Sequence, residues 1–134
     1  MKLSSLPEFD RGYITCALWL FDERPGSGDY AQSGRPEALF ANLAPAALAS
    51  MQEDCGKFKD PLRGLLDLAC QSPGYDASRA GHDFWLTRNG HGAGFWDRDE
   101  LAEDVREKLS LAARRTGERD LYLGDDGLIY VFPG

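Results

Sequence analysis

The residues with the clearest chemical potential lie in one stretch, from Gly81 to Arg98, with the sequence GHDFWLTRNGHGAGFWDR. This stretch holds both histidines of the chain, two of its three tryptophans and four glycines. Imidazole and carboxylate groups bind zinc or iron, and they also transfer protons. A small-ligand or metal-dependent activity in this stretch is therefore one hypothesis. Its candidate residues are His82, Asp83, Arg88, Asn89 and His91.

The spacing of these residues matches no established metal or catalytic motif. HExxH and HxxE do not occur, GHGAG is not the GxGxxG fingerprint of dinucleotide-binding proteins, and GxSxG and P-loop motifs are absent. Arg88 and Asn89, next to glycines, fit either an anion cradle or the end of a helix. A structural role is favoured for the two histidines, so the sequence predicts no metal, no cofactor and no catalytic residue. The question of an enzyme stays open, and a protein without catalytic activity is favoured.

Four large aromatic side chains flank the histidines: Phe84, Trp85, Phe95 and Trp96. They suit a platform that stacks on a base or a peptide. They also suit the core, where such rings are more often found. The core interpretation is favoured.

Two structures compete for residues 76–88. Asp76 is a typical N-cap, and a helix over 77–88 would end at Gly90 in the left-handed conformation. The alternative is a β-hairpin with its turn at Asn89 and Gly90. Gly81 weakens the helix, but Asp76 and the alanines after it favour it.

Elsewhere the pattern predicts further strands and helices. Residues 13–21, YITCALWLF, are almost continuously apolar and predict a strand buried on both faces. Two more strands, at 121–123 and 128–132, flank an Asp-Asp-Gly turn. We therefore expect an α+β fold: a small antiparallel sheet, with strands near these three positions, packed by about four helices.

Capping residues predict where other elements begin and end. Pro45 suits a first helical turn, and Asp99 suits the N-cap of a last helix that ends before Gly117. A short extended segment is expected at 37–43. Residues 22–36 are rich in glycine and proline and are expected to form a long loop.

Length and charge limit the class of protein. The 134 residues suffice for a single domain, 1–134, with a core of its own. Fifteen Lys and Arg against 22 Asp and Glu give a net charge of −7. Such a surface repels phosphate, so direct nucleic-acid and membrane binding are disfavoured, while a basic protein partner is attracted. Three cysteines without a CxxC pair, no apolar run of membrane-spanning length and no evident secretory signal predict a cytoplasmic protein with reduced thiols.

The stretch AGHDFWLTRNGHGAGFWDR resembles a group of small proteins encoded by phages and other bacterial mobile elements. The resemblance extends more loosely to YITCALWLFDE, FANLAPAALASMQEDCGKF and DLYLGDDGLIYVF, and so covers most of the chain. It implies an accessory protein. Such proteins commonly inhibit host defences such as CRISPR–Cas or restriction, or they bind another protein of the same element. The resemblance carries over no catalytic residue.

Resemblance and charge lead to the main hypothesis, a non-enzymatic inhibitor of anti-CRISPR or anti-restriction type in the cytoplasm of a bacterial host cell. Its expected partner is a basic host defence complex such as a CRISPR–Cas effector, because channels that hold nucleic acid are lined with Lys and Arg. Arg98, Arg106 and Lys108 lie among the acidic residues and dilute their charge. A further hypothesis is an assembly partner or homodimer. The candidate interaction residues are Asp97, Asp99, Glu100, Glu103, Asp104 and Glu107.

Overall fold

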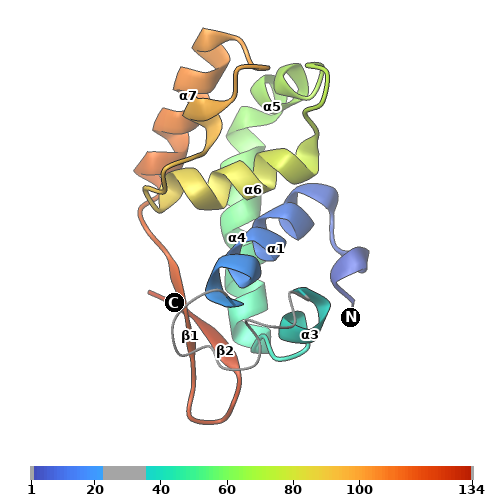
Figure 1. Cartoon of the computed structure of the whole chain (residues 1–134), viewed down its shortest axis with the longest axis vertical. Coiled ribbons are helices and arrows are strands. Elements are labelled where there is room, and N and C mark those ends of the chain that lie inside the picture. Colours follow the sequence, from blue (N-terminus) through green and yellow to red (C-terminus); the bar gives the residue numbers. More distant parts are fainter. Residues whose placement is uncertain (1, 23–35, 134) are drawn as a thin grey trace.

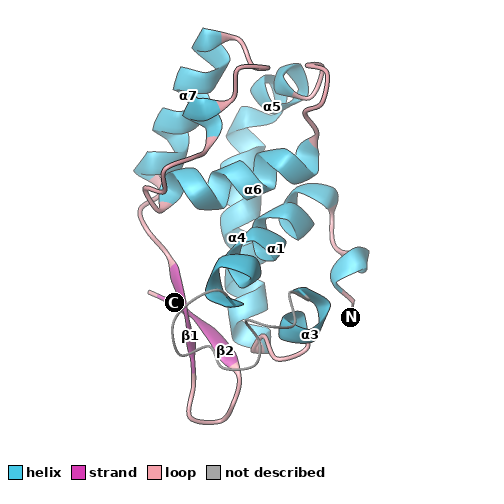
Figure 2. Ribbon diagram, in the orientation of Figure 1, coloured by secondary structure: helices cyan, strands magenta, loops and turns pink. Residues whose placement is uncertain are grey.

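The computed structural model describes residues 2–22 and 36–133, so residues 23–35 of the expected long loop lie outside the described residues. Helices form most of the described chain, and a two-stranded antiparallel sheet lies at one end of it (Figures 1 and 2). The expected α+β class is therefore confirmed. The α-helices are α1 (Glu8–Asp22), α3 (Pro36–Phe40), α4 (Pro45–Lys59), α5 (Arg63–Ala69), α6 (Ala77–Arg88) and α7 (Glu103–Arg115), and the short 3-10 turns are η1 (Leu3–Ser5), η2 (Asp60–Leu62) and η3 (Phe95–Asp97).

Residues 13–21, expected as a strand, belong to helix α1. Tyr13, Ala17 and Phe21 recur four residues apart and are buried, whereas Trp19 is exposed. The pattern of a short apolar run does not distinguish a buried strand from a buried helix. Here α1 contacts α3, α4 and α6, so apolar neighbours surround most of its circumference and the helix is apolar nearly all round. The strand prediction is wrong, and the sheet of the described chain consists of the two C-terminal strands.

Helices α1 and α6 cross in direct contact through two glycines (Figure 1). A Cβ atom added to Gly12 would lie 2.0 Å from the carbonyl oxygen of Ser78. A Cβ atom added to Gly81 would lie 1.9 Å from the carbonyl oxygen of Phe9. Ordinary van der Waals contact begins near 3.4 Å. The close approach of the two helices therefore depends on glycine at both positions.

Residues 76–88 form a capped helix, as favoured, and the hairpin alternative is wrong. The side chain of Asp76 accepts a 2.8 Å hydrogen bond from the backbone N–H of Arg79. Gly90 follows the helix with a φ of 68°, the left-handed conformation that glycine adopts without strain. Residues 83–88 are all buried, because α6 lies between α1 and α7.

The segment expected to be extended at 37–43 is mostly helical. Pro36 and Glu37 occupy the first turn of α3, where a missing N–H and a negative charge are both favourable. Leu43 keeps an extended character and forms an isolated bridge to the C-terminal strand. The extended prediction is therefore wrong for most of the segment. Pro45 begins α4 as expected.

Asp99 is not the N-cap of α7. The helix begins at Glu103, after Ala102, and no side chain caps it. Leu101 is buried, so the chain turns to insert this side chain into the core before the helix begins. At the other end, Gly117 follows α7 with a φ of 80°, as expected.

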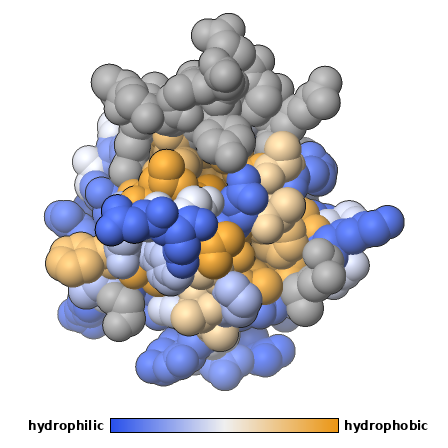
Figure 3. Space-filling model, turned by 90° about the horizontal axis from the view of Figure 1, so that it is seen from below, coloured by the Kyte–Doolittle hydropathy of each residue, from blue (hydrophilic) through white to orange (hydrophobic). Residues whose placement is uncertain are grey.

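The C-terminal strands, β1 (Asp120–Leu123) and β2 (Ile129–Phe132), confirm the predicted hairpin. Gly127 takes a φ of 83° in the turn between them. The backbone N–H of Ile129 donates to the carbonyl of Asn42 at 2.8 Å, which ties β2 to the helical part of the molecule. Seen from the hairpin end, apolar residues gather near the centre of this face, among polar ones (Figure 3). The paired residues are Asp120 with Phe132, Leu121 with Val131, Tyr122 with Tyr130 and Leu123 with Ile129.

Candidate functional site

The two histidines do not share a site. His82 lies on the exposed side of α6 and lines a pocket of about 290 Å³ with Arg79 and Arg98, whereas His91 lines a different pocket. Partial desolvation lowers the pKa of His82; Asp83 acts in the opposite direction, and the two arginines lower the pKa further. The imidazole is therefore neutral at pH 7. Among the described residues, no three His, Cys, Asp or Glu side chains are grouped to hold a metal.

Asp83 is a buried anion that anchors the loop after α6. Its carboxylate accepts hydrogen bonds from Arg98, with Nη2 at 2.7 Å and Nε at 3.0 Å from Oδ1. It also accepts a bond of 2.8 Å from the hydroxyl of Tyr75. The hydrogen bond to Asp83 raises the pKa of Arg98, and burial together with Asp83 raises the pKa of Tyr75. Asp83 thus holds Arg98 turned toward the interior.

Arg88 is the second buried charged side chain of the stretch 81–98. Its Nη1 donates to Asp54 Oδ2 at 2.9 Å and to the hydroxyl of Tyr13 at 3.0 Å. Its Nε donates to the carbonyl of Gly117 at 2.8 Å, and its Nη2 donates to the carbonyl of Thr116 at 3.2 Å. These carbonyls close the C-terminal end of α7, where a positive charge is favourable. Arg88 therefore fastens α6 to α4, to α1 and to the end of α7.

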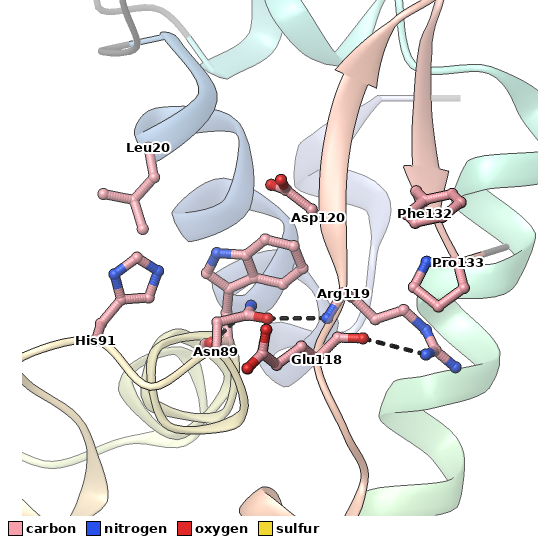
Figure 4. Close-up of a pocket in the computed structure, with 9 residues that line it drawn as sticks. Leu20, Asn89, His91, Glu118, Arg119, Asp120, Phe132 and Pro133 are labelled. Carbon is pink, nitrogen blue, oxygen red and sulfur yellow. Dashed lines mark hydrogen bonds between the residues drawn. The ribbon is translucent and has the colours of Figure 1, made fainter.

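Asn89 links the end of α6 to the residues before β1. Its Nδ2 donates to the carbonyl of Trp85 at 3.0 Å, and its Oδ1 accepts from the backbone N–H of Arg119 at 2.8 Å. This link forms one wall of an open pocket of about 500 Å³ (Figure 4). The pocket joins residues of α1, α6 and the C-terminal hairpin, so no spacing in the sequence indicates it. The other lining residues are Leu20, His91, Glu118, Asp120, Phe132 and Pro133.

Three of the four aromatic candidates belong to the core. Phe84, Trp85 and Phe95 are buried, and Phe84 stacks on Phe58 with 4.1 Å between the ring centroids. The core interpretation is confirmed for these three. Trp96 differs, because 41% of it is exposed at the surface beside α7.

The six acidic candidates are exposed along the loop 97–100 and the first half of α7. Arg98, which interrupts them in the sequence, faces Asp83 instead of this surface. Arg106 lies 3.7 Å from Asp99 and neutralises part of the negative charge. Arg79 of α6 lies 3.7 Å from Glu100, and Lys108 is exposed on α7, so these two cations offset part of the charge as well, and a negative excess remains. We call it the acidic face, and it consists of Asp97, Asp99, Glu100, Glu103, Asp104 and Glu107.

A groove of about 470 Å³ runs beside the acidic face, between η3 and α7. Half of the surface of Leu111 is exposed there, next to the exposed Trp96, while Ser110 is buried. In the sequence, Ser110 and Leu111 look like ordinary helix positions and Trp96 like a core aromatic residue, so no sequence signal indicates this groove. We call this feature the α7 groove; it is lined by Trp96, Glu103, Arg106, Glu107, Ser110 and Leu111, with Arg114 at its end.

The three cysteines should differ sharply in reactivity. Cys16 and Cys55 are buried, and Cys70 is exposed. Burial raises the pKa of Cys16 to about 12 and also raises the pKa of Cys55, so neither forms a thiolate near neutral pH.

We expect an aromatic disulfide reagent to titrate one thiol per native molecule at pH 8 and all three in denaturant. Cys70→Ser should abolish the native reaction, and a second fast thiol in wild-type protein would contradict the burial of the other two.

No protein-family model, curated protein or solved structure matches this chain. Within the described ranges, no helix combines the length and the apolar character needed to cross a bilayer.

Proposed function

We propose that this protein is a non-enzymatic inhibitor that acts in the bacterial cytoplasm and docks its acidic face on a basic host defence complex such as a CRISPR–Cas effector. The observation that carries the proposal is the exposure of six carboxylates between residues 97 and 107, with the intervening Arg98 paired inward to Asp83. The sequence resemblance to proteins of mobile elements supplies the biological context.

Electrostatics supports a basic partner. The net charge of −7 attracts a positive surface over a distance of about 8–10 Å at physiological ionic strength. Effector complexes that bind nucleic acid present lysine and arginine to phosphate. A compact acidic domain seated in such a channel would occlude it without imitating a duplex in detail.

The contacts of the stretch 81–98 favour a structural role for it over a role as a reaction centre. Two buried charged side chains of the stretch 81–98 make several hydrogen bonds each: Asp83 binds the segments before and after α6 through Tyr75 and Arg98, and Arg88 joins α6 to α4 and to the end of α7. The imidazoles of His82 and His91 line separate pockets. These hydrogen bonds fix the position of the loop that carries Asp97, Asp99 and Glu100 of the acidic face.

A binding titration against a type I effector complex, at low and at high salt, tests the proposal. We expect affinity to fall as salt rises, because the attraction between exposed charges is screened. Binding at neither salt concentration would end the proposal for this class of complex.

Charge reversal on the acidic face should weaken this binding. We expect Asp97→Lys combined with Glu107→Lys to lower affinity by about tenfold or more, mainly through slower association. The matched control is Asp67→Lys combined with Asp125→Lys, which changes two exposed acids on α5 and the hairpin turn by the same total charge. Surface plasmon resonance gives both rates. Equal losses in the two double variants would mean that net charge, and not the acidic face, governs binding.

A further inference from the structure

The α7 groove contains a buried hydroxyl that lacks a partner. Ser110 is only 3% exposed, and its Oγ makes no hydrogen bond within the described part of the chain. A buried polar atom without a partner destabilises a protein, and alanine would serve the helix better at this position. Ser110 lines the groove, so a group bound there could supply the missing hydrogen bond after a small movement of the side chains that cover the Oγ.

The same groove exposes two large apolar side chains beside charged ones. Trp96 is 41% exposed and Leu111 is 50% exposed. The other three aromatic rings of the stretch 81–98, those of Phe84, Trp85 and Phe95, are buried. Tryptophan is one of the side chains enriched among the residues that dominate binding energy at protein interfaces. Apolar centre and charged surroundings together are the arrangement of a protein interface.

The charges at the Glu103 end of the groove favour a basic group in the occupant. Glu103 and Glu107 are one helical turn apart on the same wall and belong to the acidic face. Arg106, the cation between them in the sequence, lies 3.7 Å from Asp99, and Arg114, the other cation of the lining, lies seven residues beyond Glu107 at the far end. From Glu103 to Arg114 the helix rises about 16 Å. An extended segment of about five residues spans that length.

We propose that the α7 groove receives an extended segment of the basic partner, with an apolar side chain between Trp96 and Leu111 and a lysine or arginine against Glu103 and Glu107. A polar group of the segment pairs with the Oγ of Ser110. This inference rests on the proposed function, and it adds an apolar contact that determines specificity to the electrostatic attraction of the acidic face.

The chain offers closely matched controls for the apolar contact. Trp19 on α1 is 46% exposed and lies outside the groove, and Leu68 on α5 is 51% exposed. In titrations of the type I effector complex, we expect Trp96→Ala to weaken binding by about 30-fold or more, and Trp19→Ala to leave it unchanged. Leu111→Ala should weaken it more than Leu68→Ala does. Ser110→Ala should weaken it by about fivefold while leaving stability unchanged or higher.

The outcomes separate this inference from the proposed function. Salt-dependent binding that Trp96→Ala leaves unchanged would overturn the groove while the acidic face stands. No binding by the wild-type protein would end both. Equal losses in Trp96→Ala and Trp19→Ala would also overturn the groove, once circular dichroism shows both variants folded. A measurement without variants checks the same point: in NMR spectra, the indole N–H resonance of Trp96 should shift on binding while that of Trp19 stays in place.

Discussion

Replacing Gly81 with alanine is expected to lower the free energy of unfolding by about 3 kcal/mol or more. The new Cβ atom would lie 1.9 Å from the carbonyl oxygen of Phe9, and 2.8 Å from the backbone nitrogen of Tyr13. The obstructing atoms belong to the backbone of α1, so no side-chain rotation can make room. The helices must separate, which opens the core between them. Chemical denaturation followed by far-UV circular dichroism measures the loss.

The chain provides a control in which the same substitution should have the opposite sign. Gly56 lies within α4, and a Cβ atom added there meets nothing within 4 Å. Gly56→Ala should stabilise the protein by about 0.4–1 kcal/mol, because alanine restricts the unfolded chain and favours the helix. Gly12→Ala should resemble Gly81→Ala, since it would place a Cβ atom 2.0 Å from the carbonyl of Ser78. A Gly81→Ala protein as stable as Gly56→Ala would refute the close crossing of α1 and α6.

The contrast between these glycines shows what the sequence leaves open. Taken alone, Gly81 weakens a helix, and that local cost is real. Its benefit depends on α1, which crosses α6 some seventy residues away along the chain. No spacing within α6 reveals a crossing helix, so the sequence predicts the cost of Gly81 without its purpose.

Local signals predicted the elements whose ends depend on local chemistry. Asp76 caps α6, Gly117 follows α7, and Gly127 occupies the hairpin turn, each with the expected geometry. The strand prediction for residues 13–21 is wrong, because the neighbours of an apolar run decide whether it forms a strand or a helix. The prediction of Asp99 as an N-cap is wrong, because α7 begins at Glu103, after the buried Leu101.

The candidate site, too, has features that the sequence predicts and features that it does not. The exposure of the acidic residues could be predicted, because charged side chains of this kind are rarely buried without a partner. The inward turn of Arg98 could not, since it depends on Asp83, fifteen residues earlier and on a different element. The sequence leaves an anion cradle and a helix end open for Arg88 and Asn89, and the structure places both at the end of α6 with protein groups as partners.

Replacing Arg88 with methionine is expected to lower the free energy of unfolding by about 3–5 kcal/mol. Methionine keeps much of the length of the side chain but removes every donor. Asp54 loses its shortest ion pair, and the carbonyls of Thr116 and Gly117 lose their bonds at the end of α7. Because only 1% of the Arg88 side chain is exposed, water does not reach these groups without local opening. The control is Arg63→Met, which removes an exposed pair with Asp60 and should change stability by no more than about 0.5 kcal/mol.

A double variant separates the two roles of Arg88. If the ion pair to Asp54 were its main contribution, Arg88→Met combined with Asp54→Leu would recover much of the loss, because a buried pair replaced by apolar groups is often neutral. We expect little recovery. The carbonyls of Thr116 and Gly117 would still lack donors, and Arg119, which donates to Asp54 at 3.2 Å, would lose its own partner. Hydrogen exchange should show faster opening at the C-terminal end of α7 in both variants, and full recovery of stability in the double variant would show that Arg88 acts on α4 alone.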